Sequence, residues 1–263
     1  MQGDSALGRS IGLVRDLRAR CAWDRSQTPQ TLRPYLVEEA LELDQALRSG
    51  DPEAIRDELG DLLLHLAFQI VLGEERSQFN AEVVTRVLEE KMWRRHPQLF
   101  AGTPRSEQDT WELFKRREPR GGRRGTLSGL PARLPPLLLA YRLQERAAGV
   151  GFDWKDARGP LAKVKEETAE LERELGSGER GAIEDEIGDL LFAAINLARK
   201  LGVEPGRALE RANDKFTRRF EAMEALAAER GLEFGQASLE ELDGLWEEAK
   251  ATGKDGERSS SRP

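Results

Sequence analysis

One internal repeat constrains this chain more than any other feature of its sequence. Residues 57–63 read Asp-Glu-Leu-Gly-Asp-Leu-Leu, and residues 185–191 read Asp-Glu-Ile-Gly-Asp-Leu-Leu, an offset of 185 − 57 = 128. Residues 38–42, Glu-Glu-Ala-Leu-Glu, recur as Glu-Glu-Thr-Ala-Glu at 166–170, again with an offset of 166 − 38 = 128. Two acidic motifs that keep one offset indicate a duplicated unit rather than two unrelated acidic helices.

The repeat predicts two related halves joined by a linker. Lys-Met-Trp-Arg-Arg at 91–95 resembles Lys-Phe-Thr-Arg-Arg at 215–219, so the similarity continues downstream. Residues 117–136 combine several Gly and Pro residues with five Arg residues, a composition that disfavours a helix and favours a flexible linker. We therefore expect an N-terminal domain at 1–116, this linker at 117–136, a C-terminal domain at 137–250 and a disordered polar tail at 251–263.

The composition favours helices and excludes several classes of protein. Charged residues make up 34% of the 263 residues and aromatic residues 6%, which suits helices packed by Leu and Ala better than a β-sandwich. No apolar run approaches the roughly 20 residues that span a membrane, and the N-terminus lacks a secretory signal. A single cysteine, Cys21, is consistent with the cytoplasm, where we expect the protein. The net charge of −7 argues against direct nucleic-acid binding.

Apolar residues at helical spacing predict helices in both halves, and no convincing period-two strand is found. The segment 59–72 is apolar on nearly all sides, so we expect it at the centre of a bundle. Ser-Gly-Asp-Pro at 49–52 predicts a short turn before that helix. The fold class is therefore all-α, a tandem repeat of helical bundle units, with helices predicted at residues 31–48, 52–72, 80–95, 159–176, 181–201 and 205–230.

Four carboxylates in each half are spaced to converge. Glu39 and Glu42 are three positions apart and share one helical face, and Glu58 and Asp61 do the same on the next helix. A short turn makes these helices antiparallel, so the two pairs can face each other. Four such charges repel and need a counter-charge, and hard oxygen ligands suit Mg²⁺ or Mn²⁺. The equivalent acids of the second half are Glu167, Glu170, Glu186 and Asp189.

Two other interpretations of these acids were weighed. Glu-rich helices often carry solvated charge, but Glu58 and Asp61 interrupt an apolar segment, and Glu186 and Asp189 repeat the interruption. A di-iron bundle expects Glu-x-x-His pairs, whereas His65 lies four residues after Asp61 and the second half has no His on these helices. We therefore interpret His65 as a core or edge residue.

Basic residues follow each acidic cluster. Lys215, Arg218 and Arg219 fall on the third helix of the second half. A cationic patch beside a divalent metal is what a polyphosphate requires, although such residues also occur as a solvated basic face. Trp246 can stack on a nucleobase, but a tryptophan is more often part of a core. The counterparts of the cations in the first half are Lys91, Arg94 and Arg95.

These motifs resemble those of the MazG family of nucleoside triphosphate pyrophosphohydrolases, within the all-α NTP pyrophosphatase superfamily. The pattern Glu-Glu-x-x-Glu followed by Glu-x-x-Asp is the superfamily signature. Further MazG-like motifs are Cys-Ala-Trp-Asp at 21–24, Arg-Arg-His-Pro at 94–97, Gly-Asp-Leu-Leu-Phe at 188–192 and the segment 212–220. The resemblance extends from Arg15 to Glu248.

The resemblance implies Mg²⁺-dependent hydrolysis of NTPs and dNTPs to the monophosphate and pyrophosphate, as broad-specificity house-cleaning of the nucleotide pool. It implies that a carboxylate such as Glu166 accepts the proton of a metal-activated water. It also implies a homodimer whose subunits together complete four-helix sites. The implied metal ligands are Glu167, Glu170, Glu186 and Asp189. The implied nucleotide contacts are Lys163, Glu166, Lys215, Arg219 and Trp246.

The two halves are not equivalent. Tyr35 stands where the offset would place a partner of Lys163, since 163 − 128 = 35, so the first half lacks one cation but keeps its acids. We therefore expect the second half to carry out most of the hydrolysis. Two alternatives are a superfamily specialist for dUTP or phosphoribosyl-ATP, and a nucleotide-sensing protein without turnover.

Overall fold

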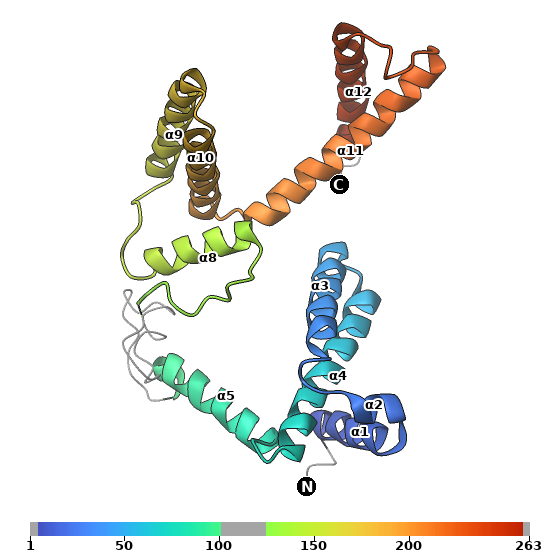
Figure 1. Ribbon diagram of the computed structural model, residues 1–263, viewed down its shortest axis with the longest axis vertical. Coiled ribbons are helices and arrows are strands. Elements are labelled where there is room, and N and C mark those ends of the chain that lie inside the picture. The colour runs from blue at the N-terminus through green and yellow to red at the C-terminus, as the bar shows by residue number, and fades with distance from the viewer. Residues whose placement is uncertain (1–4, 101–124, 260–263) are drawn as a thin grey trace. The chain divides into compact units, whose positions relative to one another are not determined.

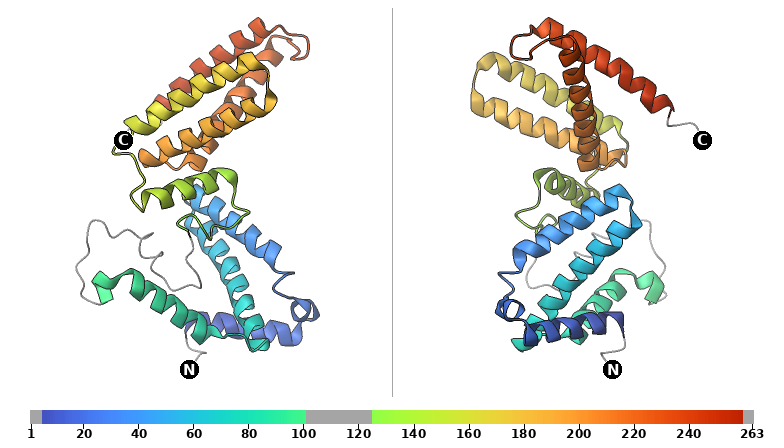
Figure 2. Two further views of the ribbon diagram at one scale, coloured as in Figure 1. Left: turned by 60° about the vertical axis from the view of Figure 1, so that its left-hand side comes forward. Right: turned by 90° about the vertical axis from the view of Figure 1, so that its right-hand side faces the viewer.

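The computed structural model of the protein describes residues 5–100 and 125–259 (Figures 1 and 2). Within these ranges every regular element is a helix, which confirms the all-α prediction. The chain divides into two compact units, residues 1–106 and 107–263, each of which is described by itself. Among the described residues, no helix combines the length and the apolar character needed to cross a membrane.

Unit 1 is organised around a helical hairpin. Helices α3 and α4 run antiparallel and side by side, and α1 packs against α4 (Figure 1). In the turn between α3 and α4, Gly50 adopts the left-handed conformation, at φ 71°. Asp51 then caps α4 by accepting a hydrogen bond from the backbone N–H of Glu53 (3.0 Å). The helices of this unit are α1 (Ala6–Arg20), α2 (Ala22–Ser26), α3 (Arg33–Ser49), α4 (Pro52–Glu75), α5 (Ala81–Arg95) and α6 (Pro97–Phe100).

Only the C-terminal half of α4 is enclosed within unit 1. Its buried residues lie between His65 and Gly73, where α1 covers the helix and Arg15 forms an ion pair with Glu74. Leu59, near the other end, is 51% exposed. Within the single chain, the first part of the segment 59–72 is therefore not enclosed, and its place at the centre of a bundle stays a prediction. The reason is that a two-helix hairpin cannot cover all sides of one of its helices.

Unit 2 repeats the hairpin and adds a second one. Helices α9 and α10 run antiparallel and side by side, with Gly178 at φ 73° at the turn, as Gly50 is in unit 1. Helices α11 and α12 pack on each other through a separate apolar cluster that includes Met223 and Leu245. The helices of this unit are α8 (Pro136–Ala148), α9 (Arg158–Ser177), α10 (Arg180–Lys200), α11 (Pro205–Glu229) and α12 (Leu239–Ser259).

Ion pairs close the end of the α9–α10 hairpin opposite its turn. Asp153, in the loop before α9, contacts Arg199 and accepts a hydrogen bond from Lys200 (2.9 Å) at the end of α10. Burial alone would raise the pKa of Asp153, but the hydrogen bonds from Arg199 and Lys200 outweigh this effect and lower it. The loop before α9 is therefore tied to the end of α10 by charged groups.

The structure bears on two of the predicted boundaries. Helix α12 continues to Ser259, so residues 251–259 are helical although their composition predicted a disordered tail from Ala251. Extending an existing helix adds one hydrogen bond per residue without the cost of nucleation, and this favours continuation into a polar segment. In the linker, residues 125–135 contain turns without a helix, and α8 begins at Pro136. Linker residues 117–124 and tail residues 260–263 lie outside the described ranges.

Candidate functional site

The α9–α10 hairpin gathers three of the predicted acids of the second half. Glu167 and Glu170 come from α9 and Glu186 from α10, and one carboxylate oxygen of each lies within 4.8 Å of the others. Glu167 is buried, whereas the other two are half-buried. Asp189 is exposed and lies outside this group, although its charge still acts on Glu186. The spacing that predicted this cluster therefore leads to a real convergence of carboxylates from two helices.

The cluster has too much negative charge for its own groups to balance. Burial and then repulsion from Glu170 and Glu167 raise the pKa of Glu186. The Oε2 atom of Glu186 is also buried and has no hydrogen-bond partner among the described residues. An unpaired buried oxygen is unfavourable, and a divalent cation would relieve both its isolation and the repulsion. A set of hard oxygen donors around such an atom fits Mg²⁺ or Mn²⁺.

Lys163 supplies part of the missing positive charge. Its Nζ lies 2.6 Å from Oε1 of the buried Glu167 and 2.9 Å from Oε1 of the exposed Glu166. These two hydrogen bonds raise the pKa of Lys163, and the bond from Lys163 lowers the pKa of Glu167. Lys163, predicted to contact nucleotide, therefore neutralises acids of the cluster in this structure. A phosphate group would have to compete with these carboxylates for its ammonium group.

The first half forms a similar cluster from a different set of acids, without the predicted Glu42, and with a different counter-charge. Glu39 from α3 and Glu58 and Asp61 from α4 lie within the same 4.8 Å limit. Burial, followed by repulsion from Glu42 and Asp61, raises the pKa of Glu58. Burial, followed by repulsion from Asp61, also raises the pKa of Glu39. The buried His65 faces this cluster, with its Nε2 3.5 Å from Oε1 of Glu39.

The contact of His65 with Glu39 was missed at the sequence level. The sequence was searched for Glu-x-x-His pairs, in which both residues lie on one helix. The contact of His65 with Glu39 instead joins α4 to α3. His65 is buried, as predicted for a core residue, but it borders the acids. The available signal was its position four residues after Asp61, which places both side chains on one helical face.

The predicted cations of the second half lie apart from its acids. Lys215 and Arg218 line a surface hollow of about 470 Å³ on α11. Within residues 125–259, no hydrogen bond or ion pair joins these residues or Arg219 to the carboxylate cluster. In the first half, Arg94 forms an ion pair with Glu90 of its own helix (3.8 Å), and Arg95 is buried. The structure thus supports the acidic clusters more directly than the basic patches.

Trp246 belongs to the apolar packing between α11 and α12. Its ring is tilted against Phe216, with centroids 5.3 Å apart, and it packs on the cluster around Leu245. This is the core role weighed as the alternative to stacking on a base. The side chain is only half-buried, however, so part of it is still accessible.

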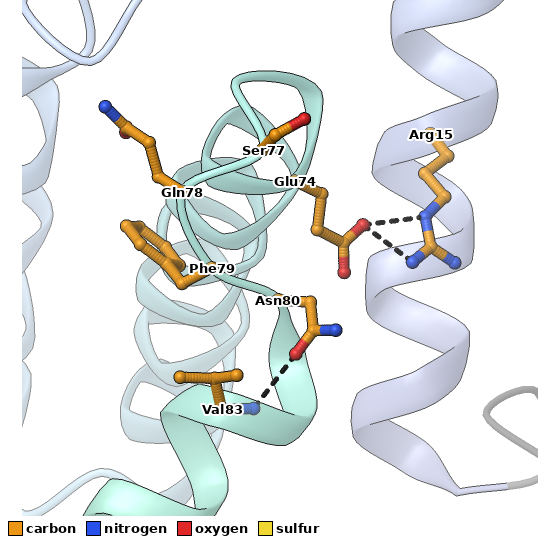
Figure 3. Close-up of a pocket in the computed structure, with 7 residues that line it drawn as sticks. All are labelled: Arg15, Glu74, Ser77, Gln78, Phe79, Asn80 and Val83. Atoms are coloured by element: carbon orange, nitrogen blue, oxygen red, sulfur yellow. Dashed lines mark hydrogen bonds and ion pairs between the residues drawn. The ribbon is translucent and has the colours of Figure 1, made fainter.

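A further hollow of about 450 Å³ lies where α4 leads into α5 (Figure 3). Two pairs of its groups interact: Arg15 donates to Glu74 (Nη2 to Oε2, 2.7 Å), and Asn80 accepts from the backbone N–H of Val83 (3.0 Å). These contacts join α1 to α4 and begin α5. We therefore interpret this hollow as part of the packing between α1, α4 and α5.

Comparison with known proteins gives the same two-part division. The family model of the MazG nucleotide pyrophosphohydrolase domain matches residues 27–100 and 159–223 of this chain. These two segments include both acidic clusters. The chain is 41% identical over 242 residues to the nucleoside triphosphate pyrophosphohydrolase/pyrophosphatase MazG of Thermotoga maritima, covering 91% of this chain and 94% of that protein. It is 36% identical over 244 residues to the nucleoside triphosphate pyrophosphohydrolase of Escherichia coli K12, covering 90% and 93%. The uncharacterized protein YabN of Bacillus subtilis is 39% identical over 247 residues, which cover 91% of this chain and 50% of YabN.

Replacing Glu186 by Gln tests the repulsion within the second cluster. Because the pKa of Glu186 is raised above 4.5, its ionised form destabilises the folded protein at neutral pH, and this penalty disappears as the pH falls below that value. Without divalent cations at pH 7, we expect Glu186→Gln to unfold at a higher temperature than the unchanged protein. The rise in unfolding temperature that Mg²⁺ causes should become smaller.

Thermal unfolding followed by circular dichroism, with and without Mg²⁺, measures both effects. Glu184→Gln is the matched control, because Glu184 is exposed on the same helix and is absent from the carboxylate group. A Glu186→Gln variant that is less stable than the unchanged protein without metal would contradict the account of charge repulsion.

Proposed function

The chain belongs to the MazG nucleotide pyrophosphohydrolase family and is a nucleoside triphosphate pyrophosphohydrolase, and we propose that its activity depends on Mg²⁺, accepts many NTPs and dNTPs, and resides mainly in the second half. The products would be the monophosphate and pyrophosphate, in keeping with a role in clearing the nucleotide pool. The observation that supports this most directly is the unpartnered, buried Oε2 of Glu186 among converging carboxylates.

The acids of the second half divide into metal ligands and a base. Glu167, Glu170, Glu186 and Asp189 would hold Mg²⁺ or Mn²⁺. When bound, the metal lowers the pKa of a water molecule and offsets charge on phosphate oxygens. Glu166 is exposed beside the cluster and is suited to accept the proton from the attacking water. Lys163 holds Glu166 and Glu167 at their present separation through its two hydrogen bonds.

The cations of α11 would bind the phosphate chain. Lys215, Arg218 and Arg219 can offset the charge that develops on phosphate oxygens during hydrolysis. Because they do not contact the acids within the described part of one chain, a second copy of α11 from a partner subunit is a suitable source. The accessible part of Trp246 is the candidate surface for a base.

Exposed apolar residues on both hairpins support a homodimer. Leu59 and Leu66 on α4 are 51% and 48% exposed, and Ile187 and Leu191 on α10 are 44% and 55% exposed. Two-helix hairpins with such surfaces are stabilised when a second pair of helices covers them, which gives a four-helix arrangement around each acidic cluster. The first-half acids, Glu39, Glu42, Glu58 and Asp61, would then hold a second metal ion.

Sedimentation equilibrium tests the proposed dimer. A chain of 29.5 kDa should sediment as 2 × 29.5 = 59 kDa at micromolar concentration. Leu191→Glu should shift the mass towards the monomer, because a charge in an apolar interface is unfavourable. Leu239→Glu is the control, since Leu239 is 83% exposed at the start of α12. A monomeric mass for the unchanged protein would contradict the proposal.

Pyrophosphate release across a panel of nucleotides tests the reaction and its breadth. With Mg²⁺, we expect release from many NTPs and dNTPs, and none after chelation of divalent cations until Mg²⁺ or Mn²⁺ is restored. Release from dUTP or phosphoribosyl-ATP alone would favour the specialist interpretation. Binding of nucleotides without any release would favour a sensing role. Either result would contradict broad-specificity hydrolysis.

Single substitutions in the two clusters test which half is active. Loss of a metal ligand removes several kcal/mol of transition-state stabilisation, so Glu186→Ala should lower kcat/KM by about 100-fold or more. Glu58→Ala is the matched change in the first half and should retain most of the activity. Full activity in Glu186→Ala together with loss in Glu58→Ala would reverse the assignment.

A further inference from the structure

Helix α11 carries a row of basic side chains on one face. Arg211, Lys215 and Arg218 are spaced at i, i+4 and i+7, which places them on the same side of the helix. All three are exposed and line a surface hollow of about 470 Å³. From Arg211 to Arg218 the row extends roughly 10 Å along the helix axis, so its charges are spread along a line instead of surrounding one point.

Two small residues leave room for a ligand between these basic side chains. Ala208 and Ala212 are exposed and line the same hollow. Because the methyl group of alanine ends close to the backbone, an anion can approach α11 between the longer arginine and lysine side chains. Among the described residues that line the hollow, Asp214 is the one acid beside three cations. The hollow is therefore suited to a negatively charged ligand.

The charge of this row is not balanced by ion pairs. Within residues 125–259, none of the three cations forms an ion pair with a carboxylate. By contrast, Arg230, which follows α11, lies 2.6 Å from Glu248 of α12. Like charges four positions apart on a helix repel each other, and Arg211 and Lys215 have this spacing. An anion bound along the row would offset this repulsion.

The aromatic packing beside the row gives it a direction. Trp246 contacts Phe216 of α11, with ring centroids 5.3 Å apart, and Phe216 directly follows Lys215 in the chain. A base stacked on the accessible part of Trp246 would therefore lie beside the C-terminal part of the row. Arg211 is at the other end, about 7.5 Å along the axis from Phe216. The phosphate farthest from the base would then lie nearest to Arg211.

We propose that Arg211 binds the terminal phosphate of a nucleoside triphosphate and makes the protein prefer triphosphates to diphosphates. The inference rests on the proposed function, because it assumes a nucleotide whose base lies at Trp246 and whose other phosphates lie at Lys215 and Arg218. A guanidinium group suits this position, since its planar N–H groups can form two parallel, charge-assisted hydrogen bonds with one phosphate. A diphosphate would end before Arg211 and would not make this contact.

Analogues with a methylene bridge between the α- and β-phosphates are the probes. They resist the cleavage that yields a monophosphate and pyrophosphate, so binding is measured without turnover. Isothermal titration calorimetry of the full chain with Mg²⁺ compares α,β-methylene-ATP with α,β-methylene-ADP. Arg211→Ala should weaken the binding of the triphosphate analogue about tenfold, because it removes hydrogen bonds to a charged group, and should change the binding of the diphosphate analogue less than about twofold.

Two further variants distinguish a specific contact from general attraction by positive charge. Arg207→Ala is the matched control, because Arg207 is exposed one turn before Arg211 and is not among the described residues that line the hollow. At physiological ionic strength it should change both affinities less than about twofold, since a charge outside the contact is screened. Arg211→Lys keeps the charge without the paired hydrogen bonds and should weaken the binding of the triphosphate analogue less than Arg211→Ala does. Circular dichroism of each variant checks that it is folded.

The outcomes separate this inference from the proposed hydrolysis. An equal loss for both analogues in Arg211→Ala, or no loss for the triphosphate analogue, would overturn the assignment of the terminal phosphate. A loss in Arg207→Ala as large as that in Arg211→Ala would also overturn it. Normal pyrophosphate release by the unchanged protein would in each of these cases leave the hydrolytic role intact. A selective loss of the triphosphate analogue, together with no release from any nucleotide, would support this inference and contradict the hydrolytic role.

Discussion

Repulsion between carboxylates on facing helices is the interaction on which the rest of this structure depends. In each half, a hairpin brings acids from two helices to within 4.8 Å of one another. The raised pKa values of Glu58 and Glu186, with burial as the first cause and neighbouring acids as the second, show that the protein does not fully balance these charges. A fold that keeps such groups together favours the binding of cations, because a bound ion offsets the repulsion between the carboxylates.

The two halves manage this charge in different ways. Lys163 bonds to the buried Glu167 and lowers its pKa, whereas Glu39, with His65 as its basic neighbour, has a raised pKa caused first by burial. Duplication makes this divergence possible, since one copy can retain the family chemistry while the other changes its counter-charge. The matched segments 27–100 and 159–223 show that both copies are still recognisable as the same domain.

Local spacing predicted much of the fold and part of the site. The six helices that were predicted lie within about three residues of their observed bounds, because their apolar periodicity, the Gly50 turn and the Asp51 cap are local features, whereas α1, α8 and α12 were not predicted as helices. Convergence of the acids followed from i, i+3 spacing on antiparallel helices. What was missed depends on contacts between elements. The bond of Lys163 to Glu167 and the approach of His65 to Glu39 involve side-chain directions, and the exposure of Leu59 depends on how far α1 extends along α4.

The contacts of Asp153 have a mechanical consequence for the second half. The α9–α10 hairpin is fastened at both ends, by the left-handed turn at Gly178 and by the ion pairs of Asp153 with Arg199 and Lys200. A slip of either helix by one residue would rotate its side chains by about 100° and carry Glu186 away from Glu170. Because such a slip would also break the Asp153 contacts, the hairpin acts as a closed frame of fixed register.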